Sequence, residues 1–197
     1  MATSLNGRYK LIPNGYRHVF LIRNPYKVFP SWKKMETEVS GLLSGIKIPP
    51  EDLVLDQLLP AEAPPGKAYQ EVTDLWLHIK ENNLDTDPII IDSDDLLQNP
   101  KEILSAVCSR VGIPYSDSLL SWETGPRVAD QWMVSAFFKN MLENAAFCQN
   151  FRNTTCFKKP VPESKNPDLA TFSPDVQRCI EYSMPYYLKL FEKRLKC

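Results

Sequence analysis

Glycine is scarce in this sequence of 197 residues. There are seven, and none stands in a Gly/Ser-rich run of the kind whose backbone N–H groups cradle phosphate groups. Two histidines and five cysteines are scattered, with no CxxC pair and no histidine at metal-ligand spacing. No apolar run approaches the roughly 20 residues of a membrane span, and residues 1–15 have no apolar core of the signal-peptide type. These absences predict a cytoplasmic chain with reduced thiols, no metal site and no membrane contact.

The composition is that of a folded globular protein, with 43% hydrophobic and 24% charged residues. The net charge of −1 hides an uneven distribution, because residues 1–35 hold seven Lys/Arg and no Asp or Glu, whereas residues 51–100 hold twelve Asp/Glu against Lys67 and Lys80. A basic segment suits a phosphorylated ligand. Nucleic acid is disfavoured, because the pI is about 6.2 and no interleaving of basic and aromatic residues recurs. The acidic stretch is interpreted as a solvated face.

A strand, a tight turn and a helix are predicted in succession near the N-terminus. The apolar run Val19-Phe20-Leu21-Ile22 is typical of a strand buried on both faces, and we place that strand at 17–22. Pro25 can open a helix, because its missing N–H would be unpaired in the first turn, and the helix is expected to run to about Gly45. This geometry places a helix N-terminus beside the carboxyl end of the strand, where anions bind.

Arg23 stands at that strand end, and Ser31 follows eight positions later. The pattern resembles the second nucleotide-binding motif of the sulfotransferases, in which an apolar strand ends in Arg-(Asn/Asp)-Pro. The resemblance implies that Arg23 and Ser31 bind the 3′-phosphate of the donor, 3′-phosphoadenosine 5′-phosphosulfate. Taken alone, the same residues also fit a surface arginine after a buried strand and a serine inside a helix.

A second unit follows after an irregular, proline-rich excursion at 46–66, which is expected to hold one short helical piece at 52–59. We predict a helix at 67–82 and a second strand, buried on both faces, at 88–92. Asn99, Pro100 and Glu102 predict a capping box at the start of the next helix, which ends at Gly112. Asp94-Asp95-Leu96 and Gly112-Ile113-Pro114 resemble a late segment of the same sulfotransferase family.

The rest of the chain is expected to be mostly helical from Tyr115 onwards, with a loop at 148–171. Leu119–Glu123 with Gly125-Pro126 resembles the tail of a sulfotransferase-like subgroup. Ser173 is expected to cap a terminal helix that begins at Pro174 and turns five apolar side chains inward: Val176, Ile180, Tyr187, Leu188 and Phe191.

The resemblance covers roughly the C-terminal two-thirds of a sulfotransferase and omits the phosphosulfate loop, the first strand and the catalytic base region. The predicted fold is therefore α/β, with an incomplete P-loop-like parallel sheet of two recognisable strands and a predominantly helical C-terminal half. We expect residues 1–197 to form a single truncated sulfotransferase-like domain. In the family the loop-bearing strand lies between these two, so here they must pair directly, leave a gap or recruit a strand from another chain.

Three functional interpretations stay open. The chain is a truncated or degenerate sulfotransferase, a working one completed by a partner chain or by missing sequence, or a non-catalytic binding or scaffolding domain. No catalytic residue is assigned, and the chain alone is expected to be inactive. The partners expected are a small-molecule acceptor and a complementing chain or a second copy, with no nucleic acid and no membrane.

Overall fold

The computed structural model describes residues 7–45, 48–58, 66–124, 132–160 and 166–197. Two strands, β1 (Val19–Ile22) and β2 (Ile89–Asp92), pair directly and in parallel, with Val19 opposite Ile89 and Ile22 opposite Asp92. The predicted α/β fold with a two-stranded parallel sheet is confirmed. Of the three arrangements left open for the strands, direct pairing is the one observed.

Helix α2 (Pro25–Ser44) follows β1 after Arg23 and the cap residue Asn24, and it confirms the predicted start and end. The Asn24 side chain accepts a hydrogen bond from the Tyr26 N–H at 3.0 Å, and Pro25 occupies the first helical position. Gly45 ends the helix with φ +68°, a left-handed conformation that glycine adopts without a steric penalty.

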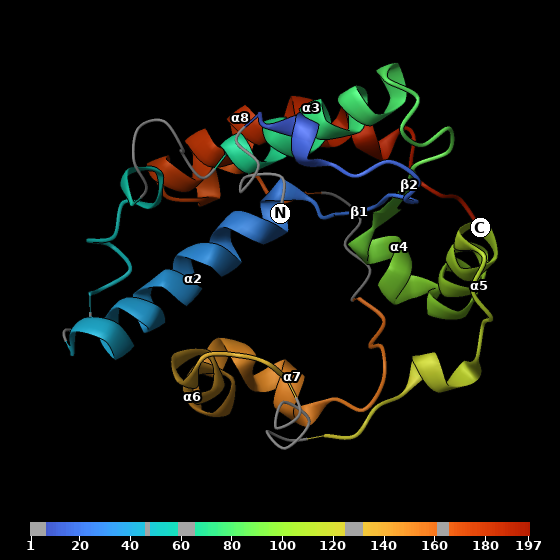
Figure 1. The fold of residues 1–197 in the computed structure, drawn as a ribbon. Helices are drawn as coiled ribbons and strands as arrows, with labels where there is room; N and C mark the ends of the chain where they lie inside the picture. The colour runs from blue at the N-terminus through green and yellow to red at the C-terminus, as the bar shows by residue number, and fades with distance from the viewer. Residues whose placement is uncertain (1–6, 46–47, 59–65, 125–131, 161–165) are drawn as a thin grey trace.

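Helices α3 (Lys67–Glu81) and α8 (Pro174–Phe191) cover one face of the sheet, as Figure 1 shows above β1 and β2. Both helices begin where the sequence predicts. The core between these layers combines residues of both strands and both helices: Phe20, Ile22, Trp76, Ile79, Ile90, Tyr187 and Leu190. The prediction for the inward side of α8 is wrong at one position, because Leu188 is 46% exposed. Leu190 is buried instead, three residues after Tyr187 and on the same face of the helix.

Helices α4 (Ser93–Gln98) and α5 (Pro100–Val111) cover the other face of β2, where Ile89 and Ile91 pack against Ile103. Gly112 ends α5 with φ +78°, as predicted. The predicted capping box is wrong, because the Asn99 side chain accepts no hydrogen bond from α5. Asn99 instead ends α4 directly before α5 begins, and its N–H donates to the Asp95 carbonyl.

The prediction that β1 is buried on both faces is also wrong. Phe20 and Ile22 are 8% and 4% exposed, whereas Val19 and Leu21 on the opposite face are 46% and 63% exposed. Apolar sequence alone does not bury a strand, because burial requires a second layer. Among the described residues, the α4–α5 layer covers β2 on that side and leaves β1 open.

The remaining elements lie beyond the sheet. Helices α6 (Ala136–Asn144) and α7 (Gln149–Asn153) pack together below α2 in Figure 1. Short 3₁₀ turns complete the described chain: η1 (Tyr9–Leu11), η2 (Leu55–Gln57), η3 (Asp117–Leu120), η5 (Ala146–Cys148) and η6 (Leu169–Thr171).

Two loop predictions are partly corrected by these elements. The loop expected at 148–171 contains α7 and η6, so it is only partly irregular. The turn η2 falls inside the helical piece expected at 52–59. Residues 46–47 and 59–65 of the excursion, and the Gly125-Pro126 pair, lie outside the described residues. None of the helices described combines the length and the apolar run that a bilayer crossing requires.

Candidate functional site

Arg23 stands at the carboxyl end of β1, directly before the cap of α2, and its side chain is exposed. Its carbonyl oxygen accepts a hydrogen bond from the Tyr69 hydroxyl at 2.8 Å, which fixes the backbone. Among the described residues, no hydrogen bond or ion pair engages its guanidinium. Burial raises the pKa of Tyr69, so this hydroxyl stays a neutral donor. A free cation therefore lies beside a helix N-terminus, an arrangement that favours anions.

Ser31 is also exposed, but it lies six residues along α2 from Pro25. At the helical rise of 1.5 Å per residue, this separation is about 9 Å along the axis. No hydrogen bond joins Ser31 to Arg23 within the described structure, and Ser31 does not line the cavity that Arg23 lines. The structure thus places Arg23 directly before the cap of α2 and Ser31 inside the helix, outside the cavity that Arg23 lines.

The carboxyl end of β2 is occupied by Asp92, which is 2% exposed. One carboxylate oxygen accepts from the Asp94 and Asp95 N–H groups at 2.9 and 3.4 Å and so caps α4. The other accepts from the Tyr187 hydroxyl at 3.0 Å. Burial raises the pKa of Asp92, and these donors offset part of that effect. Asp92 therefore fixes α4 and α8 to the strand.

The acidic pair after β2 forms two ion pairs. Asp94 contacts the Lys27 ammonium at 3.0 Å, which ties α4 to the first turns of α2. Asp95 accepts from Arg194 at 2.6 Å beyond the end of α8. Asp94 and Asp95 belong to the segment that resembles the sulfotransferases, whereas no sequence pattern predicts Lys27 and Arg194 as their partners.

A cavity of about 530 Å³ opens beside Arg23, between β1, α3 and α4. Its polar lining consists of Arg23, Tyr69 and Ser93, and the rest is aliphatic. The Ser93 hydroxyl oxygen is buried without a hydrogen-bond partner in the described structure. Sequence reasoning missed Tyr69 and Ser93, because neither belongs to a recognisable motif.

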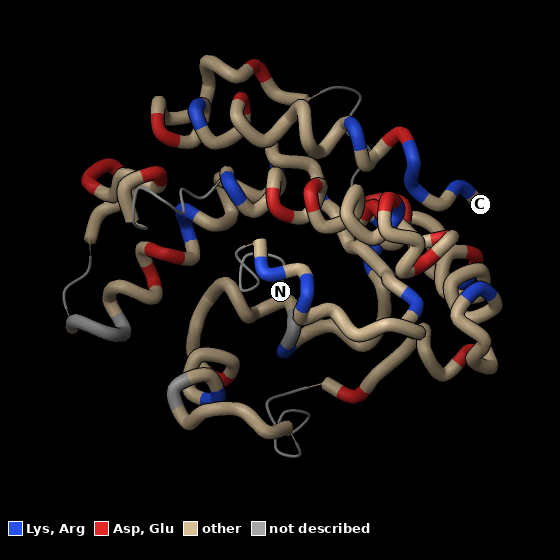
Figure 2. The backbone as a smooth tube through the Cα atoms, turned by 45° about the horizontal axis from the view of Figure 1, so that its top comes forward, with Lys and Arg blue, Asp and Glu red and all other residues tan. Residues whose placement is uncertain are grey.

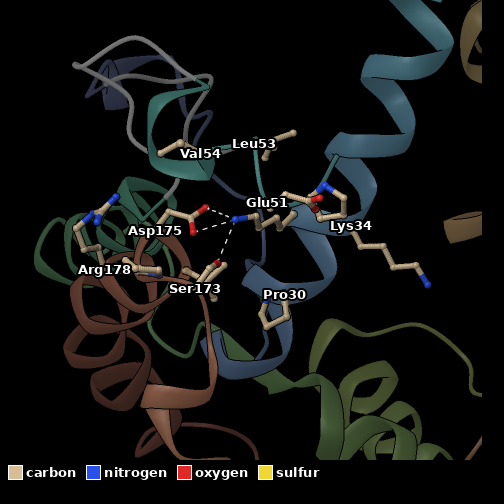
Figure 3. A pocket seen from close by; sticks show the side chains of 12 residues that line it. Pro30, Lys34, Glu51, Leu53, Val54, Ser173, Asp175 and Arg178 are labelled. Carbon is tan, nitrogen blue, oxygen red and sulfur yellow. Dashed lines mark hydrogen bonds and ion pairs between the residues drawn. The ribbon is translucent and has the colours of Figure 1, made fainter. Parts of the chain in front are cut away.

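A second cavity, of about 630 Å³, lies between α2 and the start of α8 (Figure 3). The Lys33 ammonium contacts both Asp175 carboxylate oxygens at 2.9 Å and the Ser173 hydroxyl at 3.1 Å. Burial of Asp175 would raise its pKa, but hydrogen bonds from Ser173, the Leu55 N–H and Lys33 outweigh it and hold the pKa well below its usual range. The Lys34 side chain points away from this group in Figure 3. Lys33 and Asp175 therefore pair with each other and connect α2 to α8.

Ion pairs inside the chain use much of the basic N-terminal segment that was expected to suit a phosphorylated ligand. Arg17 contacts Asp85 at 3.3 Å, and the Lys27 and Lys33 pairs have been given above. The interpretation of residues 51–100 as a solvated face is wrong for Asp85 and Asp92, which are 5% and 2% exposed. In Figure 2, Lys and Arg residues, drawn in blue, lie near both labelled ends of the chain.

Metal-ligating residues do not gather in the described ranges, where no group of three or more His, Cys, Asp or Glu could hold an ion. The five cysteines are free; Cys108, Cys148 and Cys179 are buried, and Cys156 and Cys197 are exposed.

Comparison with known proteins gives one family match and two distant relatives. Residues 82–173, which include β2, α4 and α5, match the family model described as "Sulfotransferase domain". The chain is similar to the Arabidopsis thaliana "Branched-chain-amino-acid aminotransferase-like protein 1" and "protein 2", at 28% and 25% identity over 131 residues. That alignment covers 66% of this chain but only 19% of each relative. No solved structure matches.

The family match supports a sulfotransferase-like domain. It rests on the segment from the end of α3 to the start of α8, so Arg23 and Ser31 lie outside the matched residues. The fold agrees with this class, because parallel strands with helices on both faces are the setting in which nucleotides bind at carboxyl strand ends.

Proposed function

We propose that residues 1–197 form a single sulfotransferase-like domain that binds the 3′-phosphate end of 3′-phosphoadenosine 5′-phosphosulfate. The Arg23 guanidinium is the main ligand in this proposal, and the Ser31 hydroxyl is a second one. The observation that carries it is the position of Arg23 at the carboxyl end of β1, beside the α2 N-terminus and without a partner among the described residues. A phosphate would accept hydrogen bonds from the guanidinium and lie in the favourable field of the α2 N-terminus.

Binding of adenosine 3′,5′-bisphosphate, measured by calorimetry, tests the proposed phosphate site. One or two charge-assisted hydrogen bonds contribute about 1.5–3 kcal/mol each, so a dissociation constant on the order of 1 mM is expected. Arg23→Ala should abolish the binding heat, and Ser31→Ala should weaken it. Lys34→Ala is the matched control, because it removes one cation from α2 at a site away from the β1 end. Equal heats for the wild type and Arg23→Ala would overturn the proposal.

The reaction of the family is sulfuryl transfer to a small-molecule acceptor, and we propose that this chain alone does not catalyse it. Its seven glycines include no Gly/Ser-rich run to hold the sulfuryl oxygens. Loss of even one such donor typically costs about 10²–10³ in rate. Radiolabelled donor should therefore not turn over above the buffer rate with phenols, sugars or amines. Turnover that is lost in Arg23→Ala would refute this, because it would require a cradle built from other residues.

A non-catalytic binding domain is the second candidate function. The exposed face of β1 favours it, since Val19 and Leu21 present apolar surface at the edge of the sheet. In this case the chain binds a complementing chain or a second copy.

A further inference from the structure

The cavity beside Arg23 has the size and the walls of a small-molecule site. Its volume of about 530 Å³ lies within the range of roughly 300–1,000 Å³ typical of ligand pockets. Ile22 and Leu190 are almost fully buried and pack into the core, so this side of the cavity is fixed by the fold. The remaining aliphatic lining comes from β1 and three helices: Leu21, Val28, Ala68, Val72, Leu96 and Leu97. An apolar ligand body would gain free energy by displacing water from these walls.

Two of the three polar groups in the cavity lining, on Arg23 and Ser93, can donate a hydrogen bond and have no acceptor among the described residues. The Tyr69 hydroxyl is already used, because it donates to the Arg23 carbonyl. The Ser93 hydroxyl oxygen is buried and has no hydrogen-bond partner in the described part of the chain. The exposed Arg23 guanidinium makes no hydrogen bond or ion pair there. The lining includes no Asp or Glu, and the nearby Asp94 is paired with Lys27. A buried hydroxyl and a cation on apolar walls favour a ligand with one anionic end.

We propose that this cavity binds an amphipathic monoanion, with an alkyl or aryl body against the aliphatic walls and a carboxylate or similar acidic head on Arg23. Ser93 supplies a second donor at the cavity wall. One guanidinium matches one planar head group through two parallel hydrogen bonds. Arg23 is the single cation in the cavity lining, so the charge of a polyanion held there would not be balanced. This inference goes beyond the proposed function and shares only Arg23 with it.

Calorimetric titrations of the full chain use three probes with the same alkyl chain length: octanoate, octan-1-ol and octylammonium. Comparing their affinities distinguishes the contribution of the head group from that of the alkyl chain. Octanoate should bind about tenfold more tightly than octan-1-ol, because one charge-assisted pair is added. Arg23→Gln should abolish this preference and leave octan-1-ol affinity unchanged. Ala68→Phe, which places a ring in the cavity, should weaken the binding of both octanoate and octan-1-ol by at least about tenfold. Lys34→Gln makes the same change in charge outside the cavity and should bind as the wild type does.

Equal affinity for the three probes, undiminished octanoate binding in Arg23→Gln, or no octanoate binding by the wild type would each overturn the proposal. The thermal midpoint of each variant is measured alongside. Arg23→Gln alters an exposed side chain that makes no hydrogen bond or ion pair with the described residues, so its folding is expected to be intact. Ser31→Ala distinguishes this site from the proposed phosphate site. It should weaken the binding of adenosine 3′,5′-bisphosphate but not that of octanoate. Ala68→Phe should weaken the binding of octanoate but not that of adenosine 3′,5′-bisphosphate.

Discussion

Asp85 is a buried carboxylate whose ionisation should matter for folding. It is 5% exposed and accepts from the His18 N–H at 2.7 Å and the Asp87 N–H at 3.0 Å, while Arg17 contacts it at 3.3 Å. Burial alone would raise its pKa, but these hydrogen bonds and the arginine lower it below the ordinary value. Because the folded-state pKa is depressed, the stabilisation is present above the unfolded pKa and is lost as pH falls through the folded one.

Asp85→Asn is therefore expected to lower the free energy of unfolding at pH 7 by about 1–3 kcal/mol, the cost of leaving a buried donor unsatisfied. The variant should also lose less stability than the wild type as pH falls below the ordinary pKa of an aspartate. Urea unfolding at a series of pH values measures both effects. Asp87→Asn is the control, since the Asp87 side chain is 60% exposed. If Asp85→Asn keeps the acid-dependent slope of the wild type, another carboxylate is responsible.

Arg23 also shows what the sequence predicts about single residues. Its place at the end of a strand follows from the apolar run and Pro25, and the structure agrees. The six residues from Pro25 to Ser31 correspond to some 9 Å along α2, a separation that follows from the spacing once the helix is predicted. Tyr69 and Ser93 join the site only through the packing of α3 and α4, which no local pattern encodes.

At the scale of elements, the connection between α2 and α8 depends on a buried ion pair. The Lys33 and Asp175 side chains are 12% and 6% exposed, and Asp175 also accepts from the Leu55 N–H at 2.8 Å. The serine expected to cap α8 does not do so, because the Ser173 hydroxyl accepts from Lys33 instead. A long-range partner has thus replaced a local cap.

Lys33→Met should destabilise the protein by about 3–5 kcal/mol, because it leaves the Asp175 carboxylate buried without its cation. The double variant Lys33→Met/Asp175→Asn should lose less than the sum of the two single variants, since no unpaired charge remains. Chemical denaturation of the four proteins gives the coupling. Lys34→Met provides the matched control on the neighbouring exposed lysine. Additive losses would show that the two side chains do not stabilise each other.

The two strands show why element positions are easier to predict than their environments. Both runs are apolar, and both strands form within two residues of the expected bounds. β2 is buried on both faces, whereas β1 alternates. The difference arises because α5 packs over Ile89 and Ile91 but not over Val19 and Leu21, and this depends on tertiary arrangement rather than on local pattern.

At the scale of the whole molecule, the exposed face of β1 should control association. Val19 and Leu21 are 46% and 63% exposed on a short strand of a two-stranded sheet, which is small for a chain of this length. An apolar strand edge recruits other strands. We therefore expect the purified chain to be marginally stable and to self-associate or precipitate. A sulfotransferase N-terminal segment that carries the loop-bearing strand, added in trans, should restore solubility.

Leu21→Lys should shift the chain toward monomer without lowering its thermal midpoint, because it places a charge on the exposed face and leaves the buried face intact. Leu188→Lys is the matched control, since Leu188 is 46% exposed on α8, away from the strand. Sedimentation velocity measures the association of both variants and of the wild type. If the wild-type chain is already a monodisperse monomer with a sharp, reversible thermal transition, the open face of β1 needs no partner. A shift produced equally by Leu188→Lys would assign the effect to net charge rather than to the strand.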